Sequence, residues 1–221
     1  MSLLTDPGSI QPLFIAAVGV LGVALGLLAE RIIVRTLPRY GGSPTTRVRI
    51  TTALLTGALS ALVAFRFGIS WELPAYVLLA VLGVQLSRID IANKLLPNRV
   101  IVALLLAGTV LLGAASALGS EWGDLLRAVM SAAILFVIYL ILAIISPNGL
   151  GMGDVKLAAP VGLYLGYLGW SQLFYGGAAG FVLGGLATAV LLRLRDKKSL
   201  SEVAFGPSML AAAFAVVLSL S

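Results

Sequence analysis

Long runs of apolar residues alternate with short polar segments along the whole chain. A helix that crosses a membrane needs about 20 predominantly apolar residues. The runs predict eight such helices, of which the third and the sixth are short, and the pattern therefore indicates an all-α polytopic membrane protein. The predicted spans are residues 12–30, 51–67, 73–87, 99–118, 127–146, 157–170, 173–192 and 203–220.

Composition supports this interpretation. The 221 residues are 60% hydrophobic and 11% charged, with a mean hydropathy of +1.07, whereas soluble domains carry about 25% charged residues. No repeat, low-complexity tract or second polar domain interrupts the spans, so residues 1–221 are expected to form a single membrane-embedded domain. The first span lacks the features of a signal peptide and is expected to be retained.

The basic residues predict the orientation, because Lys and Arg collect in short cytoplasmic loops. Only Arg66 and Arg127, of the 15 basic residues, fall in the loops on the other side. This distribution predicts a protein of the plasma membrane with its N-terminus outside the cytoplasm. The net charge of +6 is explained by topology and by contact with the anionic lipid bilayer, so no nucleic-acid partner is expected. The thirteen residues assigned to the cytoplasmic side are Arg31, Arg35, Arg39, Arg47, Arg49, Arg88, Lys94, Arg99, Lys156, Arg193, Arg195, Lys197 and Lys198.

Histidine and cysteine are both absent. Their absence removes the thiolate metal ligand, the commonest imidazole ligand and the commonest general base. Acid–base chemistry would therefore fall to carboxylates, lysines or tyrosines, and no metal or cofactor is expected.

Asp90 lies between the third and fourth predicted spans, before Leu95-Leu96-Pro97-Asn98. Proline disfavours helix at the preceding residue, which places Asp90 near the C-terminus of the third span. A carboxylate at membrane depth costs roughly 2.5–3.5 kcal/mol on insertion scales, so it normally marks a working site. The alternative is a loop aspartate paired with Arg88 or Lys94.

Asp154 follows three alternating glycines in Gly149-Leu150-Gly151-Met152-Gly153. Glycines permit backbone conformations that other residues avoid, and they also permit close approach of another segment. The alternative is a turn in which Asp154 caps the next helix, and that role is compatible with catalysis. Lys156 could orient Asp154, bind lipid headgroups or simply follow the charge rule of the loops.

The two aspartates are more informative together than singly. Two carboxyl groups held close together cannot both ionise cheaply, so they share one proton. One can then activate a water while its protonated partner polarises a carbonyl, which is the chemistry of aspartyl proteolysis. The predicted topology places Asp90 and Asp154 on the same membrane face, the cytoplasmic one.

Three segments resemble motifs of the type IV prepilin peptidases, a family of GxGD aspartyl proteases. Residues 151–157 are similar to its GxGD-x-KL motif, Asp90 with Leu96-Pro97-Asn98 to its first aspartate motif, and Ala204-Phe205-Gly206-Pro207 to the start of its last span. The resemblance implies a peptidase core at about residues 73–221, preceded by a helix at 12–30 and a cytoplasmic loop at 31–50.

The resemblance also implies a function. Such enzymes cut the leader from membrane-inserted prepilins and pseudopilins at the cytoplasmic face, and their catalytic aspartates match Asp90 and Asp154. Substrate-binding or loop-shaping roles would fall to Gly151, Gly153, Lys156, Pro97 and Asn98.

This chain departs from the longer members of that family. Many of those carry paired, zinc-binding cysteines in a cytoplasmic domain, which are absent here, and Arg31 stands where they tend to have Asn. Those members often also N-methylate the new N-terminus with S-adenosylmethionine, and the departures argue against that second activity.

Two other functions are compatible with paired acids in a membrane protein. A presenilin-type intramembrane protease would cleave inside a helix, and the Leu96-Pro97-Asn98 motif argues against it. A proton-coupled transporter would use the acids as a relay, but it would favour mid-span acids and inverted repeats. The expected function is therefore an aspartyl endopeptidase that processes prepilin-like precursors.

Overall fold

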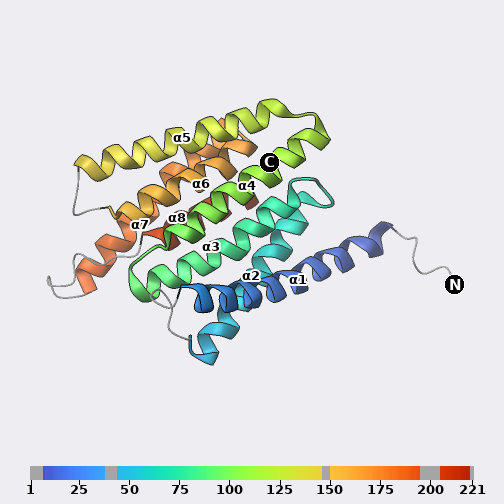
Figure 1. Ribbon diagram of the computed structural model, residues 1–221, viewed down its shortest axis with the longest axis horizontal. Coiled ribbons are helices and arrows are strands. Elements are labelled where there is room, and N and C mark those ends of the chain that lie inside the picture. Colours follow the sequence, from blue (N-terminus) through green and yellow to red (C-terminus); the bar gives the residue numbers. More distant parts are fainter. Residues whose placement is uncertain (1–6, 38–43, 146–149, 195–204, 220–221) are drawn as a thin grey trace. The chain divides into compact units, whose positions relative to one another are not determined.

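The computed structural model describes residues 7–37, 44–145, 150–194 and 205–219, and side chains from residue 11 with the exception of 187–194. The chain is all-α as predicted: no strand occurs among the described residues, which form eight helices (Figure 1). The helices are α1 (Pro7–Thr36), α2 (Thr46–Phe67), α3 (Leu73–Asn93), α4 (Asn98–Gly119), α5 (Trp122–Ile145), α6 (Met152–Leu168), α7 (Trp170–Leu194) and α8 (Gly206–Ser219).

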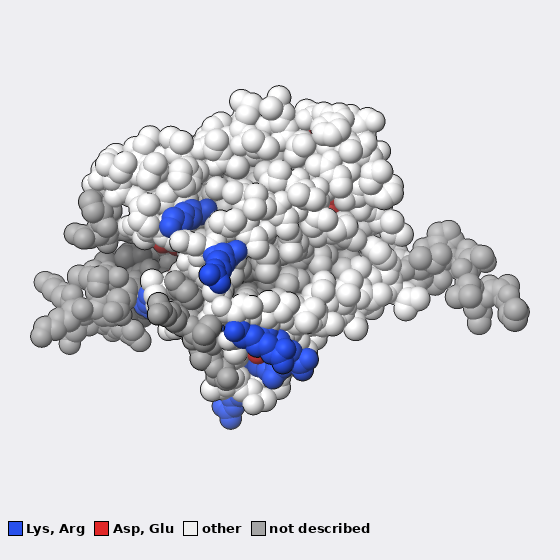
Figure 2. Space-filling view, in the orientation of Figure 1, with Lys and Arg blue, Asp and Glu red and all other residues white. Residues whose placement is uncertain are grey.

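Helices α1 to α5 are each long and apolar enough to cross a membrane, judged on the described residues. Helix α6 has 17 residues and α8 has 14, which is shorter than a full span. Figure 2 shows a surface on which charged atoms form only a few small groups, as expected for a protein surrounded by lipid.

Several predicted boundaries were wrong. The expected loop 31–50 is helical at both of its ends, because α1 continues to Thr36 and α2 already begins at Thr46. Helix α3 extends to Asn93, beyond the predicted span end at 87, and Asp90 lies near its C-terminus as the position of Pro97 predicted. Arg39, Gly149, Arg195, Lys197, Lys198 and Ala204, which the sequence analysis singled out, lie outside the described residues.

The contacts divide the chain into two compact units, residues 1–85 and 86–221, and helix α3 contributes to both. In the first unit, α1 and α2 pack closely because small residues face each other. A Cβ at Gly22 would overlap the Ser60 side chain, and one at Gly57 would overlap Val23. The expectation of a single domain over residues 1–221 remains a prediction.

Two buried polar side chains of this first unit make contacts that join its helices. Glu30 is 4% exposed and forms an ion pair with Arg49, at 3.4 Å from Oε1 to Nε. Gln85 Nε2 donates to the carbonyl of Gly26 at 3.1 Å, which ties α3 to α1.

The second unit is built around α6, which contacts α4, α5, α7 and α8. Its tightest neighbour is α5, because Gly162 and Gly166 leave room for the backbone and side chains around Ser131. The C-terminal carbonyls of α6 are capped by Arg127, whose Nε donates to Gly166 O at 2.7 Å and whose Nη2 donates to Tyr167 O at 2.5 Å. These contacts fix α6, and therefore its first turn, within the bundle.

Candidate active site

Asp90 lies on the last turn of α3 and is 4% exposed. The helix ends three residues later, at Asn93, and Lys94 then adopts a left-handed conformation (φ 55°) while its N–H still donates to Asp90 O at 2.8 Å. Asp90 is therefore part of a buried helix end, and its interpretation as a loop aspartate is wrong.

The carboxylate of Asp90 is bound by the first residue of the last helix. Gly206 N–H donates to Asp90 Oδ2 at 3.1 Å, across 116 positions of sequence. Because α8 begins at this glycine, the positive end of its dipole is directed at the carboxylate. The contact brings together two of the three segments that suggested a function.

Asp154 is the third residue of α6 and is 7% exposed. It does not occupy the N-cap position, which belongs to Gly151. Gly151 has φ −74°, so it is needed here for close approach rather than for a left-handed backbone: a Cβ on it would lie 3.0 Å from Asp154 Oδ2. Oδ1 of Asp154 is buried without a hydrogen-bond partner among the described residues.

Electrostatics links the two acids. Asp154 precedes the predicted span 157–170 and does not belong to any of the five long apolar helices. Burial, and then the charge of Asp90, raises the pKa of Asp154 to about 7, although the Gly151 backbone N–H acts in the opposite direction. The two carboxyl groups are therefore close enough to interact, and one of them can hold a proton near neutral pH.

The connection between α3 and α4 lies against both acidic segments. A Cβ at Gly153 would lie 3.0 Å from Leu96 Cβ, and a Cβ at Gly206 would lie 3.4 Å from Leu96 Cδ1. Pro97 is the N-cap residue of α4, and Asn98 Oδ1 accepts a hydrogen bond from Lys156 Nζ at 3.1 Å. The structure thus gathers the predicted residues around Asp90 and Asp154 in one unit.

Two participants were not predicted as site residues. Leu96 was quoted only as part of a motif, and Gly206 only as part of a resemblance. Gly206 contributes its backbone N–H, and the residue type does not reveal such a contribution. The sequence signal that pointed to this position was the Gly206-Pro207 pair, which is typical of a helix start.

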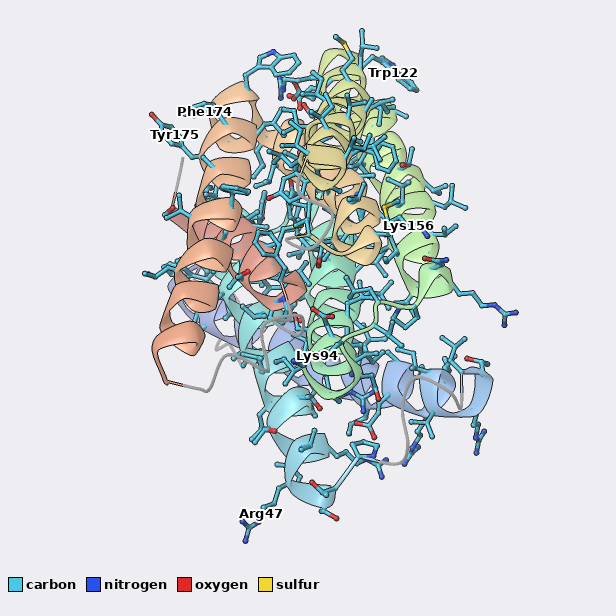
Figure 3. All side chains as sticks on the ribbon, turned by 90° about the vertical axis from the view of Figure 1, so that its left-hand side faces the viewer. Arg47, Lys94, Trp122, Lys156, Phe174 and Tyr175 are labelled. Carbon is cyan, nitrogen blue, oxygen red and sulfur yellow. The ribbon has the colours of Figure 1, made fainter. Side chains whose placement is uncertain are left out.

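The positions of charged and aromatic side chains distinguish the two ends of the second unit. Lys94, near the carboxylates, and Trp122, at the start of α5, lie at opposite ends (Figure 3).

A groove of about 540 Å³ between α5 and α7 is lined by apolar residues and Tyr139. Among the described residues, no three of the His, Cys, Asp or Glu side chains lie together as a metal site would require.

Comparison with known proteins decides the family. A sequence profile of the type IV leader peptidase family matches residues 76–192, more than half of the chain. The chain belongs to the type IV leader peptidase family. Both aspartates and the whole α3–α4 connection of this leader peptidase family member fall inside the matched region.

Curated relatives agree with this assignment. The chain is 31% identical over 169 residues to the prepilin leader peptidase/N-methyltransferase of Stutzerimonas stutzeri, an alignment that covers 75% of this chain and 56% of the relative. It is 34% identical over 161 residues to the protein of that name from Bacillus subtilis, covering 72% and 60%. The chain thus spans somewhat more than half the length of these relatives. No solved structure matches it.

Proposed function

We propose that this chain is a membrane aspartyl endopeptidase that removes the leader from type IV prepilins or pseudopilins at the cytoplasmic face. One observation carries the proposal: two buried aspartates from distant helices lie in one unit, and the charge of one acts on the other. Membership of the type IV leader peptidase family supplies the substrate class.

The arrangement supports a division of labour between the two carboxyl groups. Asp90, which accepts a hydrogen bond from the Gly206 amide, is suited to remain ionised and to take a proton from a water. Asp154, whose pKa is about 7, can hold a proton and donate a hydrogen bond to the scissile carbonyl oxygen. The water oxygen then attacks the carbonyl carbon, the peptide C–N bond breaks, and the leaving amine takes up a proton.

The positions of the acids within their helices favour hydrolysis over transport. Asp90 is on the last turn of α3 and Asp154 is on the first turn of α6. A relay for proton-coupled transport would favour acids near the middle of a span. Acids at helix ends suit a substrate whose cleavage site lies just outside its own apolar helix.

The test is cleavage of a membrane-inserted prepilin by the purified protein and by Asp90→Asn and Asp154→Asn. Each substitution keeps the side-chain shape but removes the acid–base group, so cleavage should fall by about 10²–10⁴-fold. Glu121→Gln is the matched control, because Glu121 is an exposed acid at the start of α5. Undiminished cleavage by either aspartate variant would refute the two-carboxylate mechanism.

A further inference from the structure

Two adjacent leucines in the connection between α3 and α4 have opposite environments. Leu95 is 57% exposed, whereas Leu96 is 9% exposed. The Leu96 side chain therefore contributes to the packing of the second unit, and Leu95 provides a natural comparison one residue away.

Leu96 packs against the starts of two helices at once. A Cβ added at Gly153, in the first turn of α6, would lie 3.0 Å from Leu96 Cβ and 3.3 Å from Cδ1. A Cβ added at Gly206, the first residue of α8, would lie 3.4 Å from Leu96 Cδ1. The distances at Gly153 are tighter than ordinary packing, so glycine there makes room for this leucine, whereas the distance at Gly206 is an ordinary van der Waals contact.

Each of those glycines adjoins one of the acids. Gly153 directly precedes Asp154, and Gly206 N–H donates to Asp90 Oδ2 at 3.1 Å. A shift of α6 towards α8 would therefore move one carboxyl group relative to the other, and the Leu96 side chain opposes that shift.

The connection that carries Leu96 is itself held in place. Lys156 Nζ donates to Asn98 Oδ1 at 3.1 Å, which ties α6 to the start of α4 two residues beyond Leu96. Pro97, between them, has its φ fixed by its ring, at −67°. The backbone on the C-terminal side of Leu96 is therefore restrained, while the Leu96 side chain contacts the starts of α6 and α8.

We propose that Leu96 is a positioning residue that holds the first turns of α6 and α8, and with them Asp154 and Asp90, at the separation that catalysis needs. This inference rests on the proposed peptidase function. Leu96 acts through the two aspartates and makes no bond in the reaction.

The first measurement compares prepilin cleavage by wild type, Leu96→Ala, Leu96→Met and Leu95→Ala. A misplacement of about 1 Å can cost about 10²-fold in rate, so Leu96→Ala should lower kcat by roughly 10- to 100-fold while KM stays unchanged. Leu96→Met keeps the side-chain volume and should restore most of kcat. Leu95→Ala should behave as wild type, since Leu95 is largely exposed.

A second measurement does not depend on activity. The chain has no cysteine, so Met152→Cys at the start of α6 and Ala211→Cys in α8 can carry spin labels at defined positions. Both residues are exposed. Pulsed electron paramagnetic resonance should show a shifted or broader distance distribution in Leu96→Ala, and an unchanged one in Leu95→Ala.

The outcomes separate the two proposals. A rise in KM without loss of kcat in Leu96→Ala would make Leu96 a substrate contact and overturn the positioning role. An unchanged label distance in Leu96→Ala would overturn it as well. If wild type leaves prepilins intact, the peptidase function fails, and the label distances still decide whether Leu96 sets the separation of α6 and α8.

Discussion

At the scale of single residues, the two aspartates share a chemistry but differ in their surroundings. Asp90 receives a backbone N–H at the start of α8, whereas Asp154 has a buried Oδ1 without a partner among the described residues. A catalytic pair benefits from such inequality, because one group must be ionised while the other keeps its proton. The surroundings, rather than the residue type, therefore distinguish the two proposed roles.

This inequality predicts the pH dependence of cleavage. Because the pKa of Asp154 is raised to about 7, its proton is present below that pH and is lost as the pH rises through it. If protonated Asp154 polarises the carbonyl, kcat/KM should decline above about pH 7, tenfold per pH unit once the group is mostly ionised. Steady-state cleavage between pH 5 and 9 measures this, and a profile that still rises above pH 8 would contradict the assignment.

At the scale of helices, α6 positions the site through its packing on α5. Gly166 lies against Ala128 and Ser131, and the carbonyl of Gly166 is also bound by Arg127. A helix held at its far end by a cation and along its length by close glycine contacts presents its first turn in a fixed place.

Filling this contact should loosen the whole unit. In Gly166→Ala the new Cβ would overlap the Ser131 side chain, so we expect a loss of about 1–3 kcal/mol in stability, as for other overpacked sites. Thermal unfolding in detergent measures the effect as a lowered Tm. Gly185→Ala on α7 is the control, because a Cβ there would have no neighbour within 4 Å. Equal Tm values for the two variants would show that the α5–α6 contact is slack.

The apolar pattern was sufficient to predict the helices, but their ends depended on tertiary contacts. The third span was predicted to end at 87, yet the helix continues through Arg88 and Asp90 to Asn93. Burial by partner segments that the local sequence does not reveal keeps these polar residues helical. Asp90 and Asp154 could be singled out from their cost in a membrane, whereas the Gly206 amide and the packing of Leu96 required three-dimensional structure.

At the scale of the whole molecule, the apolar helices and the distribution of basic residues are those expected of a protein that crosses a membrane several times. Helices α1 to α5 meet the length and hydropathy of a span. In the second unit, Lys94 and Trp122 lie at opposite ends (Figure 3), as expected if basic residues mark the cytoplasmic side and tryptophan the other interface.

Single cysteines can test this orientation, since the chain has none of its own. With Lys94→Cys and Trp122→Cys introduced separately, a membrane-impermeant maleimide added to intact cells should label only the cysteine at position 122. Permeabilised cells should show labelling at both positions, which controls for reactivity. Labelling of position 94 in intact cells would place the carboxylates outside the cytoplasm and exclude cleavage of a cytoplasmic leader.

The hydrogen bond between Asp90 and Gly206 has a consequence for the synthesis and membrane insertion of the chain. Translation must continue for 116 residues beyond Asp90 before the amide that binds this carboxylate exists. The third through seventh helices, which carry both aspartates, can therefore enter the membrane before the amide that binds Asp90 has been made. Under the proposed mechanism, a chain that lacks its final helix would also lack the hydrogen bond that favours the ionised form of Asp90.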